Sequence, residues 1–237
     1  MCILKISKDL VISDYYDNYF EKLCYAGLQS RGTKTFHKLI ERNWVNKTPR
    51  RILEVGAGVG EHFPFVPKEV LHKLEEYVAL DIRESELDDL KYLGENEKIL
   101  VQRKTGSVEK IPFEDGYFDR VTSTCLFHHL QDPLEAFQEV RRVLKVNGEF
   151  SIGLPTDPGI ANQIVKNLYT YRKAKKIGIP NPKFIYALEH QNHINSLLVI
   201  LKEVFSNDSV KIKYWPLKIP SQNLNLAVSA HIVKSQH

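Results

Sequence analysis

The sequence predicts an α/β fold, with a mostly parallel sheet and helices on both of its faces. Residues 52–55 and 77–80 have the near-continuous apolar character of strands that are buried on both faces. Residues 118–125 are expected to form a further buried strand and residues 149–154 a fifth strand, and they flank a stretch with helical spacing at 134–144. Strands that alternate with helices in this way indicate parallel strands joined by crossover helices.

The segment before the first strand, residues 14–46, is expected to form one or two helices. Aromatic and apolar residues recur there at near-helical spacing, and the pattern breaks around Gly32. We therefore expect residues 1–48 to form a helical cap and residues 49–237 to form the main domain.

A glycine-rich turn follows the first strand. Gly56, Gly58 and Gly60 have no Cβ, so the turn can adopt positive φ and bring its backbone close to a ligand before a helix begins near Glu61. The G-x-G-x-G spacing differs from the G-x-G-x-x-G of dinucleotide sites. Glu54, two residues before the first glycine, would repel a phosphate but suits a cationic ligand such as a sulfonium amino acid.

The run E-V-G-A-G-V-G, residues 54–60, resembles the first motif of class I S-adenosylmethionine-dependent methyltransferases, in particular the type 11-like methyltransferases. This resemblance implies that the turn, including Ala57, lines the methionine part of the cofactor. It also implies that Glu54 helps to hold the ammonium group of the cofactor. The alternative is an ordinary tight turn between a strand and a helix.

A second acid stands at the end of the next strand. Residues 76–81 end in Asp81, and a carboxylate at this place can accept both ribose hydroxyls. Asp81 and the adjacent Ile82 are therefore candidate cofactor contacts. Alternatively, Asp81 caps a helix expected at 85–93.

Residues 106–121 resemble the segment between the third and fourth strands of the family. Many members have Asp where this chain has Ser107, so a neutral hydroxyl or the backbone would meet the adenine amino group. The resemblance implies adenine contact through Ser107 and Val108, and cofactor contact through Thr124 and Cys125. It also places residues 126–133 beside the methyl group that is transferred.

Two histidines are candidate general bases. Methyl transfer is an in-line displacement, so the protein chiefly supplies alignment and a dry site. A hydroxyl acceptor must also lose its proton, and histidine has the unperturbed pKa nearest neutrality. His129 and His193 are our candidates for this step. The alternative for His129 is that it only ends the strand and bonds the following loop.

The aromatic residues of the cap have two interpretations. In many relatives this segment covers the cofactor site, which makes Tyr15 and Tyr19 candidate substrate contacts. Aromatic side chains at positions i and i+4 are also typical of core packing. Arg31 is a candidate anion contact or an ordinary solvated loop residue.

Residues from about 155 to 188 are expected to form an insertion that covers the site and selects the substrate. Loops beyond the carboxyl ends of parallel strands line the binding crevice of such sheets. The basic residues of this insertion either receive a phosphate or carboxylate of the substrate or form a solvated helix face.

A polar segment, Glu189 to His193, precedes an apolar stripe at helical spacing. We expect His190 on the buried face of that helix, with Glu189 one turn before His193. Buried polar groups need hydrogen-bond partners, so this segment either braces the insertion or lines a pocket. Glu189, His190 and His128 are candidate substrate contacts.

The same residues allow a metal interpretation. Glu189 and His193 at i and i+4, with His128 and His129, offer oxygen and nitrogen ligands. Some methyltransferases for vicinal diols or catechols use a divalent ion, but such hard-metal sites prefer carboxylate and amide oxygens. The residue types favour a site without metal.

Composition limits the partners. The chain has 33 basic and 29 acidic residues and a formal net charge of +4, which indicates a mixed surface and no nucleic-acid partner. Three cysteines without metal-ligand spacing favour reduced thiols and a cytoplasmic location. No apolar run is long enough for a membrane span. A small-molecule or glycan substrate is expected, and the oligomeric state stays open.

The family resemblance implies a Rossmann-like, seven-stranded, mostly parallel sheet with the order 3-2-1-4-5-7-6. Residues 209–215 and 224–233 would be its last two strands, and the last strand would be antiparallel. The resemblance implies S-adenosyl-L-methionine as cofactor and S-adenosyl-L-homocysteine as product. The basic insertion and the E-H-x-N-H segment look similar to methyltransferases that act around bacterial glycans, so a saccharide or glycolipid hydroxyl is the first acceptor hypothesis. The alternatives are an N- or C-methyltransferase, or a non-catalytic cofactor-binding module.

Overall fold

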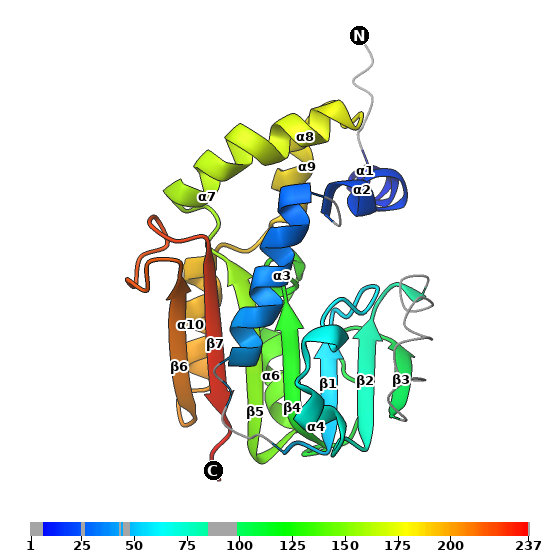
Figure 1. Cartoon of the computed structure of the whole chain (residues 1–237), viewed down its shortest axis with the longest axis vertical. Coiled ribbons are helices and arrows are strands. Elements are labelled where there is room, and N and C mark those ends of the chain that lie inside the picture. The colour runs from blue at the N-terminus through cyan, green and yellow to red at the C-terminus, as the bar shows by residue number, and fades with distance from the viewer. Residues whose placement is uncertain (1–6, 25–26, 43, 45–47, 85–98, 237) are drawn as a thin grey trace.

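The structure is a computed structural model that describes residues 7–24, 27–42, 44, 48–84 and 99–236. It contains a seven-stranded sheet in the order β3-β2-β1-β4-β5-β7-β6 (Figure 1). Neighbouring strands are parallel except β7, which is antiparallel to both β5 and β6. This confirms the predicted fold class and strand order. The strands are β1 (Arg51–Val55), β2 (Glu76–Asp81), β3 (Leu100–Thr105), β4 (Phe118–Thr124), β5 (Leu144–Pro155), β6 (Ser209–Trp215) and β7 (Ala227–Val233).

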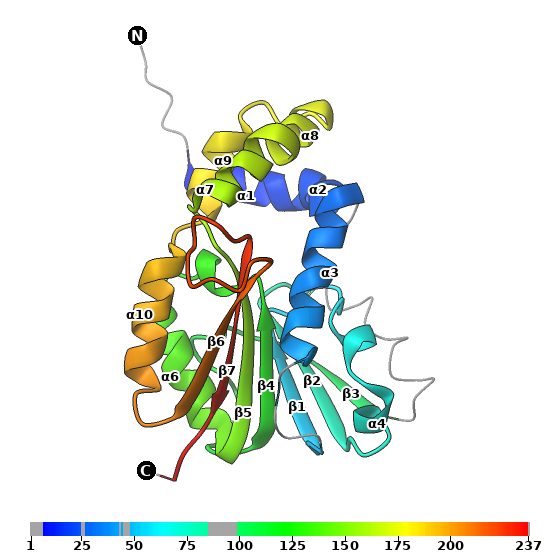
Figure 2. The ribbon, with the colours of Figure 1, turned by 60° about the vertical axis from the view of Figure 1, so that its left-hand side comes forward.

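Helices cover both faces of the sheet and the space beyond its carboxyl end. In Figures 1 and 2, α3 lies on one face, α6 and α10 lie on the other, and α1, α2 and α7 to α9 lie above the tips of the parallel strands. The helices are α1 (Lys8–Tyr15), α2 (Glu21–Cys24), α3 (Gly27–Arg42), α4 (Lys68–Leu71), α6 (Pro133–Val143), α7 (Ile160–Val165), α8 (Tyr171–Lys176), α9 (Pro182–Glu189) and α10 (Ile194–Val204). Short π- and 3-10-helical turns are η1 (Tyr16–Phe20), η2 (Phe63–Phe65), η4 (Phe127–His129) and η5 (Lys166–Thr170).

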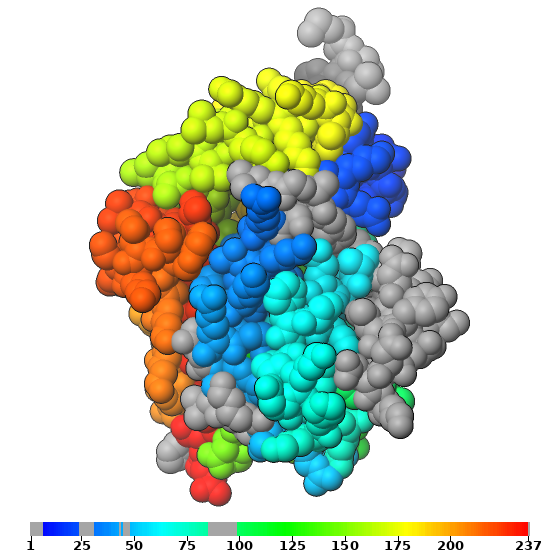
Figure 3. All heavy atoms as spheres, in the orientation of Figure 1, coloured from blue at the N-terminus to red at the C-terminus, as the bar shows by residue number. Residues whose placement is uncertain are grey.

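Three apolar clusters hold these layers together. The largest packs α6 and α10 against the central strands, and a second packs η2 and α4 against the outer face of β1 and β2. A third, smaller cluster contains Tyr15, Leu23, Ala174 and Ile179 and joins the N-terminal helices to the 155–189 segment. The space-filling view shows these two parts of the chain meeting at the top of the molecule (Figure 3). The N-terminal helices and the insertion thus form one layer above the strand tips.

The helix expected near Glu61 is absent. The chain instead continues from the glycine turn through η2 to the short α4. Pro64 and Pro67 explain the difference, because proline has no amide hydrogen and disfavours helical geometry in the residue before it. Val66 accordingly adopts an extended conformation, with ψ of 126°.

The break expected around Gly32 is also wrong, because α3 runs through this residue. A Cβ at Gly32 would meet no atom within 4 Å, so the position is open to solvent. A glycine on an exposed helix surface costs only about 1 kcal/mol relative to alanine, and the packing of α3 on the sheet outweighs it. The last strand begins at Ala227 and not at residue 224. The helix expected at 85–93 lies outside the described residues.

Among the described residues, no helix combines the length and the apolar character needed to cross a bilayer.

Candidate functional site

The glycine turn has the backbone conformation that its sequence predicts. Gly56, Gly58 and Gly60 have φ of 68°, 50° and 80°, a region that residues with a Cβ rarely adopt. A Cβ on Gly56 would lie 2.9 Å from the side chain of Leu126. The turn therefore needs glycine at this position both for its φ and for the close approach of the segment after β4.

Asp81 ties the turn to the end of β2. Its Oδ2 accepts a hydrogen bond from the Gly58 amide at 2.8 Å, and its Oδ1 accepts one from the Arg83 amide at 3.0 Å. Each carboxylate oxygen keeps a second lone pair, so these contacts leave Asp81 able to accept hydroxyl groups. The adjacent Ile82 is 71% exposed, as a residue that borders an open site would be.

Glu54 lies beneath the turn. The side chain is 3% exposed, and its Oε2 accepts a hydrogen bond from the Tyr77 hydroxyl at 2.6 Å. Burial raises the pKa of Glu54 to about 8, although the Tyr77 hydrogen bond acts in the opposite direction. A cation placed against the turn would favour the ionised form of this carboxyl group.

The other candidate cofactor contacts lie at the carboxyl ends of β3 and β4. The Ser107 hydroxyl accepts a hydrogen bond from the Glu109 amide at 3.1 Å, and Val108 is buried. Thr124 ends β4, and the half-buried Cys125 follows with a positive φ of 54°. The segment after β4 therefore turns back sharply toward the glycine turn.

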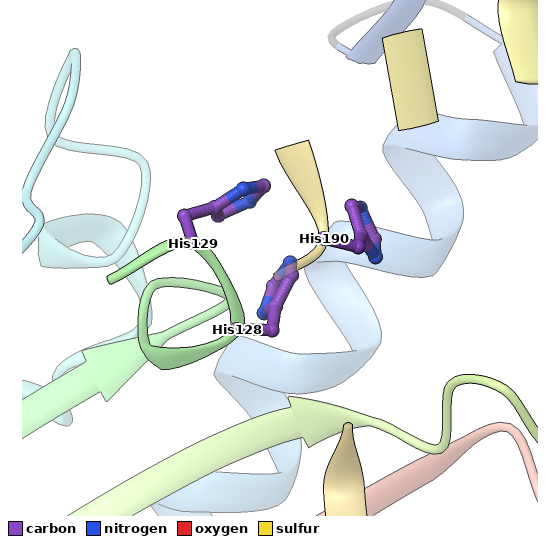
Figure 4. A group of neighbouring side chains, drawn as sticks. All are labelled: His128, His129 and His190. Atoms are coloured by element: carbon purple, nitrogen blue, oxygen red, sulfur yellow. The ribbon is translucent and has the colours of Figure 1, made fainter. Parts of the chain in front are cut away.

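Three imidazoles gather in space beyond the carboxyl end of β4. His128 and His129 lie on η4, and His190 follows α9 (Figure 4). One ring nitrogen from each residue lies within 4.8 Å of the others. Asn192 fixes this arrangement, because its side-chain amide donates to the carbonyl oxygens of Phe127 at 3.3 Å and Leu130 at 2.7 Å.

Carboxylates and carbonyl oxygens hold two of these rings. Nδ1 of His190 lies 2.9 Å from Asp157 Oδ2, and Asp157 also forms an ion pair with Lys166. Nδ1 of His129 lies 3.1 Å from the carbonyl oxygen of Glu189. The Glu189 carboxylate in turn accepts a hydrogen bond from the Tyr16 hydroxyl at 2.7 Å.

Burial keeps the three imidazoles uncharged. It lowers the pKa of His128, His129 and His190, and the proximity of the rings to one another lowers the pKa of His128 and His129 further. At neutral pH the rings therefore offer lone pairs at the place where the family resemblance puts the transferred methyl group.

His193 lies outside this group. The expectation that Glu189 and His193 are one helical turn apart is wrong, because α9 ends at Glu189 and α10 begins at Ile194. His193 is exposed, and it precedes α10 without a side-chain capping bond. The pair therefore does not have the helical geometry on which the metal interpretation of the sequence depended.

The cap residues lie in two environments. Tyr15 and Tyr19 line a cavity of about 450 Å³ between α1 and α9, together with apolar residues such as Ile179 and Phe184. Tyr15 is also part of the small cluster that joins these helices, so core packing accounts for much of its burial. Arg31 is exposed on α3 and does not lie in a loop.

Sequence reasoning assigned no individual role to Asp157, Asn192 or Tyr16, although Asn192 lies in the E-H-x-N-H segment and Tyr16 among the aromatic residues of the cap. Each acts through a contact distant in sequence, which no local pattern predicts.

A buried ionic group under α3 was also missed. Arg120 of β4 contacts Glu41 at 2.8 Å and lies over the Trp44 ring at 4.0 Å, while His62 contacts Glu41 at 2.9 Å. His37 connects this group to the site, because its Nδ1 lies 3.2 Å from His62 Nδ1 and 3.5 Å from the Thr124 hydroxyl. The signal in the sequence was an arginine within a stretch that was expected to be a buried strand.

Comparison with known proteins identifies relatives of this chain. Residues 53–152 match the model of the Methyltransf_11 family, described as a methyltransferase domain. The Bacillus subtilis protein YrhH, whose name groups it with the methyltransferases, is 30% identical over 133 residues, which are 54% of this chain and 69% of YrhH. The uncharacterized methyltransferase YcgJ of B. subtilis is 28% identical over 131 residues, 53% of this chain and 49% of YcgJ. The chain spans about half the length of most of the curated relatives it matches.

Solved structures share the fold. The crystal structure of B. subtilis YcgJ aligns with a TM-score of 0.60 at 15% identity and covers 86% of this chain and 100% of YcgJ. The [4+2]-cyclase SpnF aligns with a TM-score of 0.63 at 12% identity, over 93% of this chain and 87% of SpnF. Since a cyclase has the same fold, the fold alone does not fix the reaction.

Proposed function

Because the chain belongs to the class I S-adenosylmethionine-dependent methyltransferase family, we propose that it transfers a methyl group from S-adenosylmethionine to a hydroxyl group of a small molecule. The observation that carries the proposal is the group of three uncharged imidazoles directly after β4. A hydroxyl oxygen becomes a better nucleophile when its proton is accepted as the bond to the methyl group forms, and an uncharged imidazole offers a lone pair for it. The burial that lowers the pKa of His129 to about 3 also makes this ring a weaker base than a free imidazole.

The residues around the glycine turn suit the cofactor. The positive-φ glycines leave room for the methionine part, Glu54 lies below as a latent anion, and Asp81 retains lone pairs for the ribose. Ser107 and Val108 would border the adenine. The bound cofactor supplies an activated methyl group and a neutral thioether leaving group, with S-adenosylhomocysteine as product.

We propose that His129 accepts the hydrogen bond, and then the proton, of the acceptor hydroxyl group. A carbonyl oxygen only accepts hydrogen bonds, so the contact with the Glu189 carbonyl places the ring proton of His129 on Nδ1. The lone pair of Nε2 is then left to accept a hydrogen bond from the acceptor. Saccharide and glycolipid hydroxyls are the first acceptors to test, because the basic insertion lies over this end of the sheet (Figure 1).

The test compares His129→Asn with His193→Asn, the two candidate bases of the sequence. Release of S-adenosylhomocysteine is measured with a panel of saccharides, glycolipids, phenols and amines. We expect His129→Asn to lower kcat/KM on a hydroxyl acceptor by at least about 100-fold, while His193→Asn changes it little. Calorimetry should show that both variants bind S-adenosylmethionine like the unaltered chain.

Three outcomes contradict the proposal. If only amines are methylated and His129→Asn is fully active on them, the chain is an N-methyltransferase. If the loss appears in His193→Asn alone, the base is misassigned. If the cofactor binds and no acceptor in a broad screen is methylated, the chain is a cofactor-binding module.

A further inference from the structure

We propose that His128, His129 and His190 form a binding site for one divalent transition-metal ion of the Zn²⁺ class. The three rings come from two separate parts of the chain, η4 and the connection between α9 and α10, and they lie near one another (Figure 4). This ligand set differs from the one considered from sequence, because it includes His190 and excludes Glu189 and His193.

The distances between the rings are close to those of a three-histidine site. Two nitrogens bound to one tetrahedral Zn²⁺ at 2.0–2.1 Å lie about 3.3 Å apart. The candidate ligand atoms here lie within 4.8 Å of one another. The largest of these separations therefore exceeds the value for a bound ion by about 1.5 Å.

Hydrogen bonds already set the tautomers that a metal requires. Because a carboxylate and a carbonyl oxygen only accept, the contacts with Asp157 and Glu189 place a proton on Nδ1 of His190 and of His129. Nε2 of both rings is then left as the ligand atom. A histidine ligand whose other nitrogen donates to a carboxylate or carbonyl group is the usual arrangement at protein metal sites.

His128 supplies a second, independent observation. Its side chain is 4% exposed, and its Nδ1 has no hydrogen-bond partner among the described residues. A buried polar atom without a partner destabilises the folded state. A cation bound by all three rings would give this nitrogen a partner.

The surrounding charges are mixed, with the two carboxylates nearest the rings. Asp157 contacts His190 directly, and the Glu189 carboxylate lies 3.5 Å from Nδ1 of His129. Lys166, bound to Asp157, and Arg83, stacked on Tyr16 at 4.0 Å, are the opposing cations. The two carboxylates thus contact the rings directly, while Lys166 is paired with Asp157 and Arg83 is stacked on Tyr16.

Three imidazole nitrogens select the class of ion. Mg²⁺ and Ca²⁺ prefer oxygen ligands, whereas Zn²⁺, Co²⁺ and their neighbours bind imidazole well. Three protein ligands leave a fourth position for water or a substrate oxygen. Binding of the ion would occupy the Nε2 lone pair of His129, so an acceptor hydroxyl in the fourth position would be made more acidic by the ion and would not be deprotonated by His129. That use of the site rests on the proposed function, but binding of the ion does not.

The experiment is a titration of the chelator-treated, full-length chain with Co²⁺, followed by competition with Zn²⁺. We expect one equivalent of Co²⁺ to give the visible absorption of a four-coordinate ion and one equivalent of Zn²⁺ to abolish it. His190→Ala and His128→Ala should each remove the signal. Asp157→Asn should weaken Co²⁺ affinity by about 10- to 100-fold with the same spectrum, because Asp157 only orients His190.

His193→Ala is the matched control, since it removes an exposed imidazole three residues from His190. Its titration should equal that of the unaltered chain, and S-adenosylmethionine binding by each variant reports that the domain is folded. Absence of a one-equivalent signal, or its loss in His193→Ala and retention in His190→Ala, would overturn the site. If the ion binds but no hydroxyl is methylated, the site stands and the proposed function fails. If hydroxyls are methylated and no ion binds, the reverse holds.

Discussion

The buried carboxyl group of Glu54 makes the stability of the chain depend on pH in an unusual direction. Burial raises the pKa of Glu54 from 4.5 to about 8. Between these values the folded chain holds a proton that the unfolded chain has released. The free energy of unfolding contributed by this group is therefore highest below pH 4.5 and falls as the pH rises toward 8.

The size of the effect follows from the two pKa values. A pH of 7 is about 2.5 units above the pKa of 4.5 that Glu54 has in the unfolded chain. Each unit corresponds to 1.36 kcal/mol, so the free energy of unfolding is lower by about 3 kcal/mol at pH 7 than at pH 4.5. Glu54→Gln places a neutral side chain of similar size at this position and removes the loss. The variant should therefore gain about 3 kcal/mol over the unaltered chain as the pH is raised from 4.5 to 7.

Urea unfolding of both chains, without cofactor, at several pH values between 4.5 and 8 measures this difference. Other titrating groups cancel because only the difference between the two chains is used. Tyr77→Phe is the control: it removes the hydrogen bond that lowers the pKa of Glu54, so the loss should persist and extend to higher pH. A constant difference between Glu54→Gln and the unaltered chain across the range would refute the reasoning.

Three further substitutions test other parts of the structure. Gly56→Ala introduces a Cβ at φ of 68° and 2.9 Å from Leu126, and the resulting strain of about 1 to 2 kcal/mol should weaken S-adenosylmethionine binding roughly tenfold in calorimetry. Arg120→Met removes the cation beside the buried Glu41 carboxylate, which then has only the His62 ring as a partner among the described residues, and should lower the free energy of urea unfolding by about 3 to 5 kcal/mol. Asn192→Ala removes two hydrogen bonds to carbonyl groups around η4 and should lower it by about 1 to 3 kcal/mol.

Matched controls exist for two of these changes. Gly32→Ala lies on an open helix surface and should stabilise the chain by roughly 0.5 to 1 kcal/mol, without effect on cofactor affinity. Gln191→Ala, next to Asn192, removes only a long, exposed hydrogen bond of 3.4 Å to the His129 carbonyl and should change stability by less than about 0.5 kcal/mol. Equal effects of the Gln191 and Asn192 substitutions would show that the Asn192 bonds do not hold η4. An Arg120→Met chain as stable as the original would show that Glu41 is not charged in the core.

The sequence allowed the sheet and the glycine turn to be predicted because both depend on local physical constraints. Continuous apolar runs have few alternatives to buried strands, and the G-x-G-x-G turn has few alternatives to positive φ. The order of the strands came from the family resemblance, which the structure confirms. The α4 region failed because two prolines outweighed the expectation that a helix follows the glycine turn.

The histidine site was only partly predictable. The sequence showed His128 and His129 as a pair after a strand. It did not show that the helix is interrupted between Glu189 and Ile194, because the apolar stripe of α10 does not indicate where that helix begins. His190 lies in the inward-facing group, as the apolar pattern predicted, but on the connection before α10 and not on that helix. Asp157 contacts His190, which lies 33 residues later in the chain, after the insertion. No local sequence pattern predicts a contact of this kind.

The origin of His190 has an evolutionary consequence. Under the proposed function, the contacts to the methyl donor come from residues at the strand ends of the core sheet, whereas part of the acceptor side is delivered by the segment that passes over them. Recombination or drift in that segment can exchange one acceptor chemistry for another while the machinery for the methyl donor is inherited intact.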